Sequence, residues 1–251
     1  MVSASPLWVQ DRLFGRRRAW QIGDIVTAPA YRGQGLFREC LTTICDALPA
    51  GDIIICFPNG NSRSALLKQD FVPVVDLRYW ARPAFWWHRA SPTRISAALS
   101  YSGDLSNAGS HDLHVIRDAA YFNWRYLDCP SRAYAVLADG PTSNPGGILV
   151  FRRFSDALPI AVVMDLHGSP QALKRLIGHL DDEARRQRLL AIMTLRTTPE
   201  GVGRFGMLRI PMNLQPKRML LVARWAGASE SRSPQELRRP WHLQAGDWDG
   251  L

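Results

Sequence analysis

The residues with the clearest chemical potential lie between Gly23 and Leu48, in the segment GDIVTAPAYRGQGLFRECLTTICDAL. A β-branched run, Ile25-Val26-Thr27, favours an extended strand, and Pro29 ends that strand because proline has no N–H to donate. Arg32-Gly33-Gln34-Gly35 follows, and apolar residues then recur at helical spacing up to Leu48. This order places free backbone N–H groups at a helix N-terminus, which is a site where phosphate binds.

The loop fits neither of the common nucleotide-binding motifs. It lacks the Gly-Lys-Ser/Thr end of a P-loop and the Gly-x-Gly-x-x-Gly spacing of a dinucleotide fingerprint. It resembles the acyl-CoA pyrophosphate loop of the GNAT N-acetyltransferase superfamily, whose pattern is Gln/Arg-x-x-Gly-x-Gly/Ala. Arg32 and Gly35 match, whereas Phe37 stands where the family usually has Gly or Ala. Pro29 resembles the family's strand exit, and the alternative is a strand-turn-helix without a ligand.

The resemblance implies that acetyl-CoA is the co-substrate. The residues whose amides would hold its pyrophosphate are Gly33, Gln34, Gly35, Leu36 and Phe37, with the side chain of Arg32 adding a positive charge. The exposed edge of Ile25, Val26 and Thr27 would pair with the pantetheine amides like an added strand. Asn59 and Asn61 stand where the family often places an asparagine that contacts CoA or the acceptor. Turn formation and helix capping are the alternative for both asparagines.

Direct transfer to an amine needs a base for the acceptor and an acid for the leaving thiolate. Asp24, expected on the central strand, is the candidate base, and a surface carboxylate is the alternative. The family's frequent acid is a tyrosine in the helix before Phe71, where this chain has Leu66 and Leu67. Acyl transfer can also proceed mainly by positioning.

Composition favours a soluble globular protein of ordinary hydrophobicity. The 251 residues are 46% hydrophobic and 21% charged, and no apolar run is long enough to cross a bilayer. We found no signal pattern at the N-terminus and therefore expect a cytoplasmic protein that does not contact a membrane. The four cysteines, Cys40, Cys45, Cys56 and Cys129, form no Cys-x-x-Cys pair, which predicts reduced core thiols and no metal site.

The formal charge of +9 suits anionic partners, and coenzyme A is one of them. Arg16-Arg17-Arg18 is the only dense basic run, and it is expected in a solvated hairpin turn. Nucleic acid is therefore an unlikely partner on sequence grounds. A small-molecule amine acceptor is the expected partner, and the sequence leaves the oligomeric state open.

The order of elements predicts an α/β protein with a mixed sheet, built from tandem GNAT-like lobes. We expect four segments along the chain. They are a partial lobe with the pyrophosphate loop (1–87), a linker (88–112), a second GNAT-like lobe (113–225) and a loosely ordered tail (226–251). Only 22 residues precede Gly23, so the first lobe is expected to be N-terminally truncated. The second lobe has His167-Gly168-Ser169-Pro170 in place of the double-glycine loop, which predicts a degenerate lobe that does not bind CoA.

Two further clusters have ordinary explanations. His111 and His114 flank Asp112, and a solvated linker is favoured over a metal site. The aromatic group Trp80, Phe85, Trp86 and Trp87 beside His88 is expected to pack between the lobes rather than to stack bases or sugars.

Three functions therefore follow from the sequence. The main hypothesis is an acyl-CoA-dependent N-acyltransferase that moves an acetyl group to a small bacterial metabolite or amino sugar. The second is a non-catalytic protein of the same fold, used for binding or assembly. The third, nucleic-acid binding, depends on net charge alone and would show a steep salt dependence.

Overall fold

The structure is a computed structural model, and it describes residues 1–84, 93–95, 98–105, 113–130, 132–155, 157–198, 202–227 and 233–248. Two compact units divide the chain. The first contains 1–77, 110–115 and 217–242, and the second contains 78–109, 116–216 and 243–251. The units interleave along the sequence, whereas the sequence predicted consecutive segments. A late strand causes the difference, because β12 (Met219–Trp225) returns to the first unit and pairs there with both β3 and β4.

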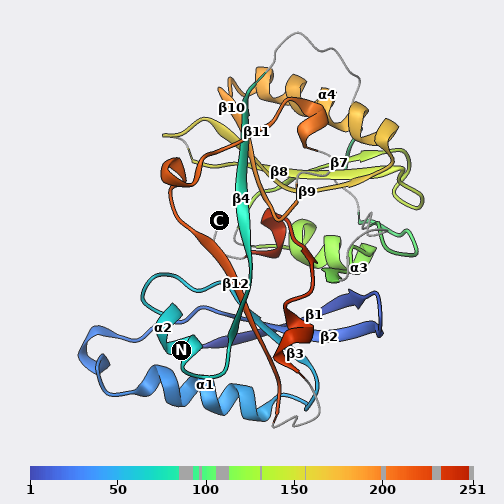
Figure 1. The fold of residues 1–251 in the computed structure, drawn as a ribbon. Helices are drawn as coiled ribbons and strands as arrows, with labels where there is room; N and C mark the ends of the chain where they lie inside the picture. The colour runs from blue at the N-terminus through green and yellow to red at the C-terminus, as the bar shows by residue number, and fades with distance from the viewer. Residues whose placement is uncertain are drawn as a thin grey trace. The chain divides into compact units, whose positions relative to one another are not determined.

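The first unit is built on a mixed sheet (Figure 1). Its strands, in spatial order, are β13 (Trp241–His242), β6 (Leu113–Val115), β1 (Ser3–Asp11), β2 (Gly15–Gly23), β3 (Ile53–Cys56), β12 and the first half of β4 (Val72–Pro83). The predicted hairpin is present as the antiparallel pair β1–β2, but the predicted place of its turn is wrong, because Arg16-Arg17-Arg18 lies on β2 and the turn is at 12–14. β2 and β3 are parallel, so the chain between them must cross over the sheet, and helix α1 (Leu36–Ala47) provides that crossover.

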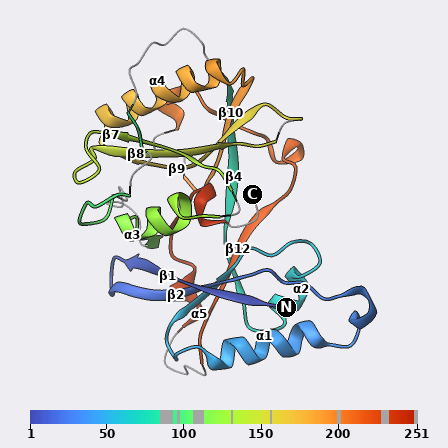
Figure 2. The same cartoon turned by 180° about the vertical axis from the view of Figure 1, so that it is seen from behind.

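One face of this sheet carries the unit's apolar core. β3 is a continuous apolar strand with every residue buried, as predicted. α1 packs on the same core through Leu41 and Cys45, and α2 (Arg63–Leu67) packs there through Leu66. Figure 2 shows α1 running along the sheet. Cys40 was predicted in the core but is exposed.

The second unit repeats the strand pairing of the first. Its sheet order is the second half of β4, then β10 (Ala191–Arg196), β9 (Ile160–Gly168), β8 (Gly147–Arg153), β7 (Ala135–Asp139) and β5 (Thr93–Ile95), with β11 (Leu208–Arg209) also on β4. β8 and β9 are antiparallel, β9 and β10 are parallel, and β10 and β4 are antiparallel. The chain is therefore a mixed α/β protein with a large mixed sheet, as the sequence predicted.

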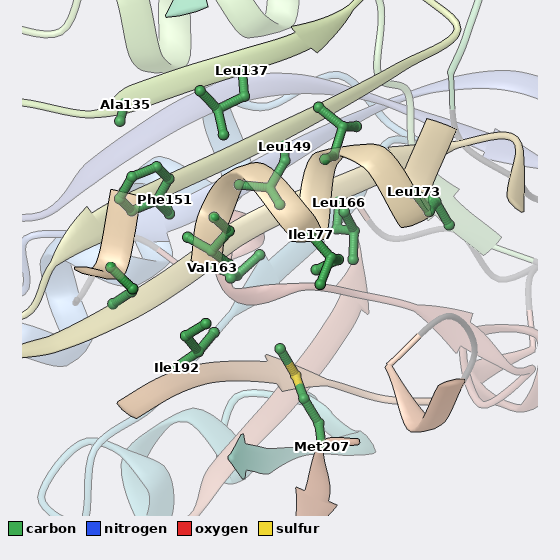
Figure 3. Close-up of a cluster of buried hydrophobic side chains, with 14 of the residues drawn as sticks. Ala135, Leu137, Leu149, Phe151, Val163, Leu166, Leu173, Ile177, Ile192 and Met207 are labelled. Carbon is green, nitrogen blue, oxygen red and sulfur yellow. The ribbon is translucent and has the colours of Figure 1, made fainter. Parts of the chain in front are cut away.

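Helix α4 (Pro170–Arg186) covers the sheet of the second unit. At its start the Oγ of Ser169 accepts from the amide of Ala172, and proline lies in the first turn. Leu173 and Ile177 point from α4 toward Leu166 and Val163 on the sheet (Figure 3). The remaining helical segments are α3 (Ala119–Phe122), α5 (Pro234–Leu237) and the short turns η1 (Pro29–Tyr31), η2 (Asn123–Leu127), η3 (Gly203–Phe205), η4 (Met212–Leu214) and η5 (Ala245–Asp247).

A buried ionic network crosses the second unit. The Nε of Arg117 donates to Asp165 at 2.9 Å, and its Nη2 donates to Asp247 at 2.6 Å. The hydroxyl of Tyr126 also donates to Asp165. Burial would raise the pKa of Asp165, but the Arg117 guanidinium and the hydrogen bonds to the carboxylate hold this pKa below its usual value. Burial raises the pKa of Asp247, against the opposing effect of Arg117.

Gly246 lies where a side chain would break this network. A Cβ at that position would overlap with the hydroxyl of Tyr126 and the carboxylate of Asp165. We expect Gly246→Ala to lower the free energy of unfolding by about 2–3 kcal/mol, because the polar network cannot move without losing hydrogen bonds. Denaturant titration measures this change. The matched control is Gly203→Ala, in another short helical turn with no atom near the new Cβ. Equal effects of the two substitutions would contradict the prediction.

The predicted linker and tail are both more ordered than the sequence suggested. Within 88–112, β5 pairs with β7, and the described residues Leu99 and Tyr101 are buried. Within 226–251, Trp241 and Trp248 are buried and α5, β13 and η5 form. Phe85, Trp86, Trp87, His88, His111 and Asp112 lie outside the described residues. Among the residues that are described, no helix is both long enough and apolar enough to cross a bilayer.

Candidate functional site

The segment that leads to the glycine loop is a bulge and not the predicted strand. β2 ends at Gly23, and Asp24 has a left-handed φ of 47°. The β1–β2 register pairs Ser3 with Gly23, so Met1 would face residue 25 if the pairing continued unchanged. Instead the backbones of Met1 and Val26 exchange two hydrogen bonds, at 2.7 and 3.0 Å. The segment between Gly23 and Val26 therefore contains one more residue than the segment between Met1 and Ser3 that faces it. Such an extra residue in one of two paired strands is a β-bulge.

The bulge changes what this segment can offer to a ligand. The N–H and C=O of Val26 are both occupied by Met1, which removes them from the predicted pairing with pantetheine. The carbonyl of Thr27 accepts from the Nε of Arg32 at 3.2 Å. In the described part of the chain, no residue bonds the backbone groups of Ile25 or the N–H of Thr27. These groups are the ones that remain for an extended ligand.

The loop itself presents unpaired amides at the start of α1. Gly33 and Gly35 have left-handed φ values of 79° and 78°, and Gly35 is the N-cap of α1. The described residues contain no acceptor for the backbone N–H groups of 33–37. Residues 32–35 are exposed, and Leu36 and Phe37 are half-buried. The loop therefore offers consecutive amide donors, together with the positive end of a twelve-residue helix, to an anion.

The glycines are required by backbone conformation and not by lack of space. A Cβ at Gly33 or Gly35 would meet no atom within 4 Å. A left-handed φ costs a residue with a side chain about 1–2 kcal/mol, whereas glycine adopts it without this cost. The open space above both positions is the room that a diphosphate needs.

A pocket of about 230 Å³ opens beside the loop. Its lining residues are Met1, Val2, Val26, Thr27, Ala28, Tyr31, Leu36, Phe37 and Cys40. Most of these side chains are apolar, and Tyr31 and Cys40 supply a phenol and a thiol. Phe37, which departs from the family pattern, also packs against the core of the first unit. The pocket and the free amides therefore share the first turn of α1.

Sequence reasoning identified part of this lining and missed the rest. Val26, Thr27, Leu36 and Phe37 were predicted as cofactor-binding residues. Met1 and Val2 were missed because they reach the pocket only through the bulge pairing. The sequence could have indicated Tyr31 and Cys40 as lining residues, because each lies within four residues of a predicted site residue and has a reactive side chain.

Three predicted site residues lie elsewhere in the first unit. The carboxylate of Asp24 is exposed and accepts from the hydroxyl of Ser3 at 2.9 Å. The Oδ1 of Asn59 accepts from the amides of Asn61 and Ser62, both at 3.0 Å, so Asn59 closes the turn before α2. None of Asp24, Asn59 and Asn61 is among the described residues that line the pocket.

In the second unit, main-chain atoms occupy the space at the start of the corresponding helix, α4. The amide of Ser169 donates to the carbonyl of Gly146 at 3.1 Å. A Cβ at Gly168 would overlap with Gly147 and lie 2.6 Å from the carbonyl oxygen of Gly146. Pro170 has no N–H at all. The first turn of α4 therefore lacks the open space that lies above Gly33 and Gly35 at the start of α1. In the described residues, no group of three His, Cys, Asp or Glu side chains could hold a metal ion.

Known proteins resemble the chain in structure but not in sequence. No family model and no curated protein matches the sequence. A GCN5-related N-acetyltransferase from Anabaena variabilis aligns with a TM-score of 0.60 at 14% identity, covering 90% of this chain and 59% of that one. A probable N-acyltransferase of unknown function from Enterococcus faecalis aligns with a TM-score of 0.57 at 14% identity, covering 90% and 58%.

A third solved structure is the N-myristoyltransferase of Saccharomyces cerevisiae with bound myristoyl-CoA. It aligns with a TM-score of 0.52 at 12% identity, covering 95% of this chain and 68% of that one. The chain spans less than two thirds of the length of the two bacterial proteins. The likeness establishes that the chain has the fold of the GCN5-related N-acetyltransferases, as the loop resemblance predicted.

Proposed function

Since the chain has the fold of the GCN5-related N-acetyltransferases, we propose that it is an acyl-CoA-dependent N-acyltransferase with its CoA site in the first unit. The observation that carries the proposal is the run of unpaired backbone amides at 33–37, exposed at 33–35, beside an open pocket. Acetyl-CoA is the proposed co-substrate, and an amine of a small metabolite or amino sugar is the proposed acceptor. The second unit is proposed as a degenerate lobe of the same type that does not bind CoA.

Different residues around the loop would bind different parts of acyl-CoA. The amides of Gly33 to Phe37 would donate to the diphosphate oxygens, and Arg32 would add a charge beside them. The pantetheine arm would run along the backbone groups of Ile25 and the N–H of Thr27, which are not bonded within the described residues. The apolar lining from Val26, Leu36 and Phe37 would exclude water from the thioester end.

Transfer then needs an amine nitrogen held against the thioester carbonyl. The nitrogen forms the new C–N bond, the C–S bond breaks, and the nitrogen loses a proton while the thiolate leaves. Asp24 stays our candidate for the proton acceptor, although its carboxylate is exposed and bonded to Ser3. Positioning alone supplies a large rate factor in such reactions. The proposal places the reaction in the cytoplasm, in keeping with four free cysteines.

A binding protein without catalysis is the second candidate, and one observation favours it. The position where the family often has a tyrosine is occupied by Leu66, which is fully buried, and by Leu67. Neither side chain can give a proton to a leaving thiolate. Such a protein would keep the CoA site and use the bound state for assembly.

Thiol release across a panel of amines separates the two candidates. We expect release of free CoA with at least one class of primary amine, at a rate that depends on both substrates. Gly35→Glu should abolish this release, because it places a negative charge at the N-cap of α1. If no amine causes release of free CoA while acetyl-CoA still binds, the second candidate, a binding protein without catalysis, is supported instead.

A further inference from the structure

Figure 1 shows the β1–β2 hairpin. Near its turn, large apolar side chains are exposed beside arginines. Leu13 is 67% exposed, Phe14 is 51% exposed and Trp8 is 44% exposed. Arg12 and Arg16 are exposed next to them. We call Trp8, Arg12, Leu13, Phe14, Arg16 and Arg18 the hairpin surface. Apolar side chains that are grouped on a surface and bordered by polar residues mark sites of contact with proteins or membranes.

The tip is held rigid by a buried carboxylate. The Oδ1 of Asp11 accepts from the amides of Leu13 and Phe14, at 2.8 and 3.2 Å. The guanidinium of Arg239 donates to both oxygens of Asp11, at 3.0 and 2.6 Å. Asp11 itself has no exposed surface. The backbone that carries the two apolar side chains is therefore tied to the first unit, which lowers the entropy cost of ordering the turn on a partner.

The charge around the tip is positive. Arg12, Arg16, Arg17, Arg18 and Arg239 are grouped here. In the described part of the chain, Asp11 pairs with Arg17 and Arg239, and Asp52 pairs with Arg18. Asp11 is buried beneath the turn, so its charge does not face a partner. The hairpin surface therefore combines an apolar tip with an excess of positive charge, which complements an anionic partner.

The aromatic rings at this surface are already covered by the protein's own cations. The guanidinium of Arg16 lies 4.3 Å from the ring of Trp8, and that of Arg17 lies 4.5 Å from the ring of Phe14. Nucleic-acid bases bind by stacking on open ring faces, and aliphatic Leu13 offers them nothing. An anionic bilayer is complementary to this arrangement, because the apolar tip can enter the acyl region while the arginines bind the headgroup phosphates. We propose that the hairpin surface docks the protein on anionic lipid membranes.

Co-sedimentation of the full chain with lipid vesicles tests this proposal. We expect binding to vesicles of equal parts phosphatidylglycerol and phosphatidylcholine, and much weaker binding to phosphatidylcholine alone. Leu13→Ser should reduce the partition coefficient about tenfold, because one leucine no longer enters the acyl region. Replacing both Arg12 and Arg16 with glutamine should reduce it about thirtyfold and weaken its salt dependence.

Leu208→Ser is the matched control, since Leu208 is 76% exposed in the second unit and lies outside the hairpin surface. It should bind vesicles like the unchanged protein. Circular dichroism would show that the variants are folded. The proposal is overturned if the protein does not bind anionic vesicles, or if Leu13→Ser binds as well as the control. Salt-sensitive binding to a single-stranded oligonucleotide without vesicle binding would also overturn it and would assign the charge to nucleic acid.

Discussion

Acetyl-CoA at a hundred times its dissociation constant should raise the free energy of unfolding by about 2.7 kcal/mol. Gly35→Glu should abolish this gain. Gly35 is the N-cap of α1, with a φ of 78°, and its amide is one of the run proposed to hold the diphosphate. A glutamate there adds negative charge where the ligand brings its own, and its side chain occupies the open space above the loop. Thermal unfolding with and without acetyl-CoA measures the gain for each variant.

Gly103→Glu is the matched control for this substitution. Gly103 also has a left-handed φ, of 102°, and open space for a Cβ, but it belongs to the second unit. Both variants lose stability through backbone strain, and the comparison of liganded with free protein removes that loss. A full gain in Gly35→Glu, equal to that in Gly103→Glu, would show that the diphosphate does not lie at this loop.

Arg117→Met should destabilise the protein by about 3–5 kcal/mol, because it leaves buried carboxylates without their cation. Asp165 and Asp247 both lose their partner, while the methionine fills a similar volume. Proteins of this size are stable by only about 5–15 kcal/mol, so the variant is expected near the limit of folding. Urea titration followed by circular dichroism measures the difference from the unchanged protein.

The pH dependence distinguishes loss of charge pairing from loss of packing. In the unchanged protein the pKa of Asp165 is below its usual value, so its contribution to stability is present above about pH 4 and is lost below it. Without Arg117 the buried carboxylates prefer to be protonated, and their pKa values in the folded state should rise. The deficit of the variant should therefore shrink as the pH falls from about 7 to about 4.

Arg175→Met serves as the control for the removal of an arginine. Arg175 donates to both oxygens of Asp139, at 2.5 and 2.6 Å, but its side chain is mostly in solvent. Water screens this pair, so we expect a much smaller loss and no comparable change with pH. A deficit in Arg117→Met that stays constant with pH would mean that packing, and not charge, is what the substitution removes.

Local patterns were sufficient to predict the elements that frame the loop. The run Ile53-Ile54-Ile55-Cys56 is apolar on both sides, and it forms β3 with every residue buried. Ser169-Pro170 predicts a helix start through one side-chain acceptor and one fixed φ, and α4 begins there. The glycines at 33 and 35 adopt the left-handed conformation that few other residues accept. In each case the cause lies within a few neighbouring residues.

Features that depend on distant partners could not be predicted in this way. The bulge after Gly23 exists because Val26 bonds with Met1, and β-branched residues alone predicted a regular strand instead. The bond between Arg117 and Asp247 joins residues 130 apart along the chain. The sequence of 226–251 gave no local sign that Asp247 would be buried. The position of Asp24 away from the pocket follows from the same bulge.

The insertion of β12 between β3 and β4 has a consequence for synthesis on the ribosome. Residues 1–77 of the first unit are translated before 219–225, so the gap in its sheet stays open until β12 has been made. During that interval the edges of β3 and β4 have unpaired backbone groups, which are templates for misassembly.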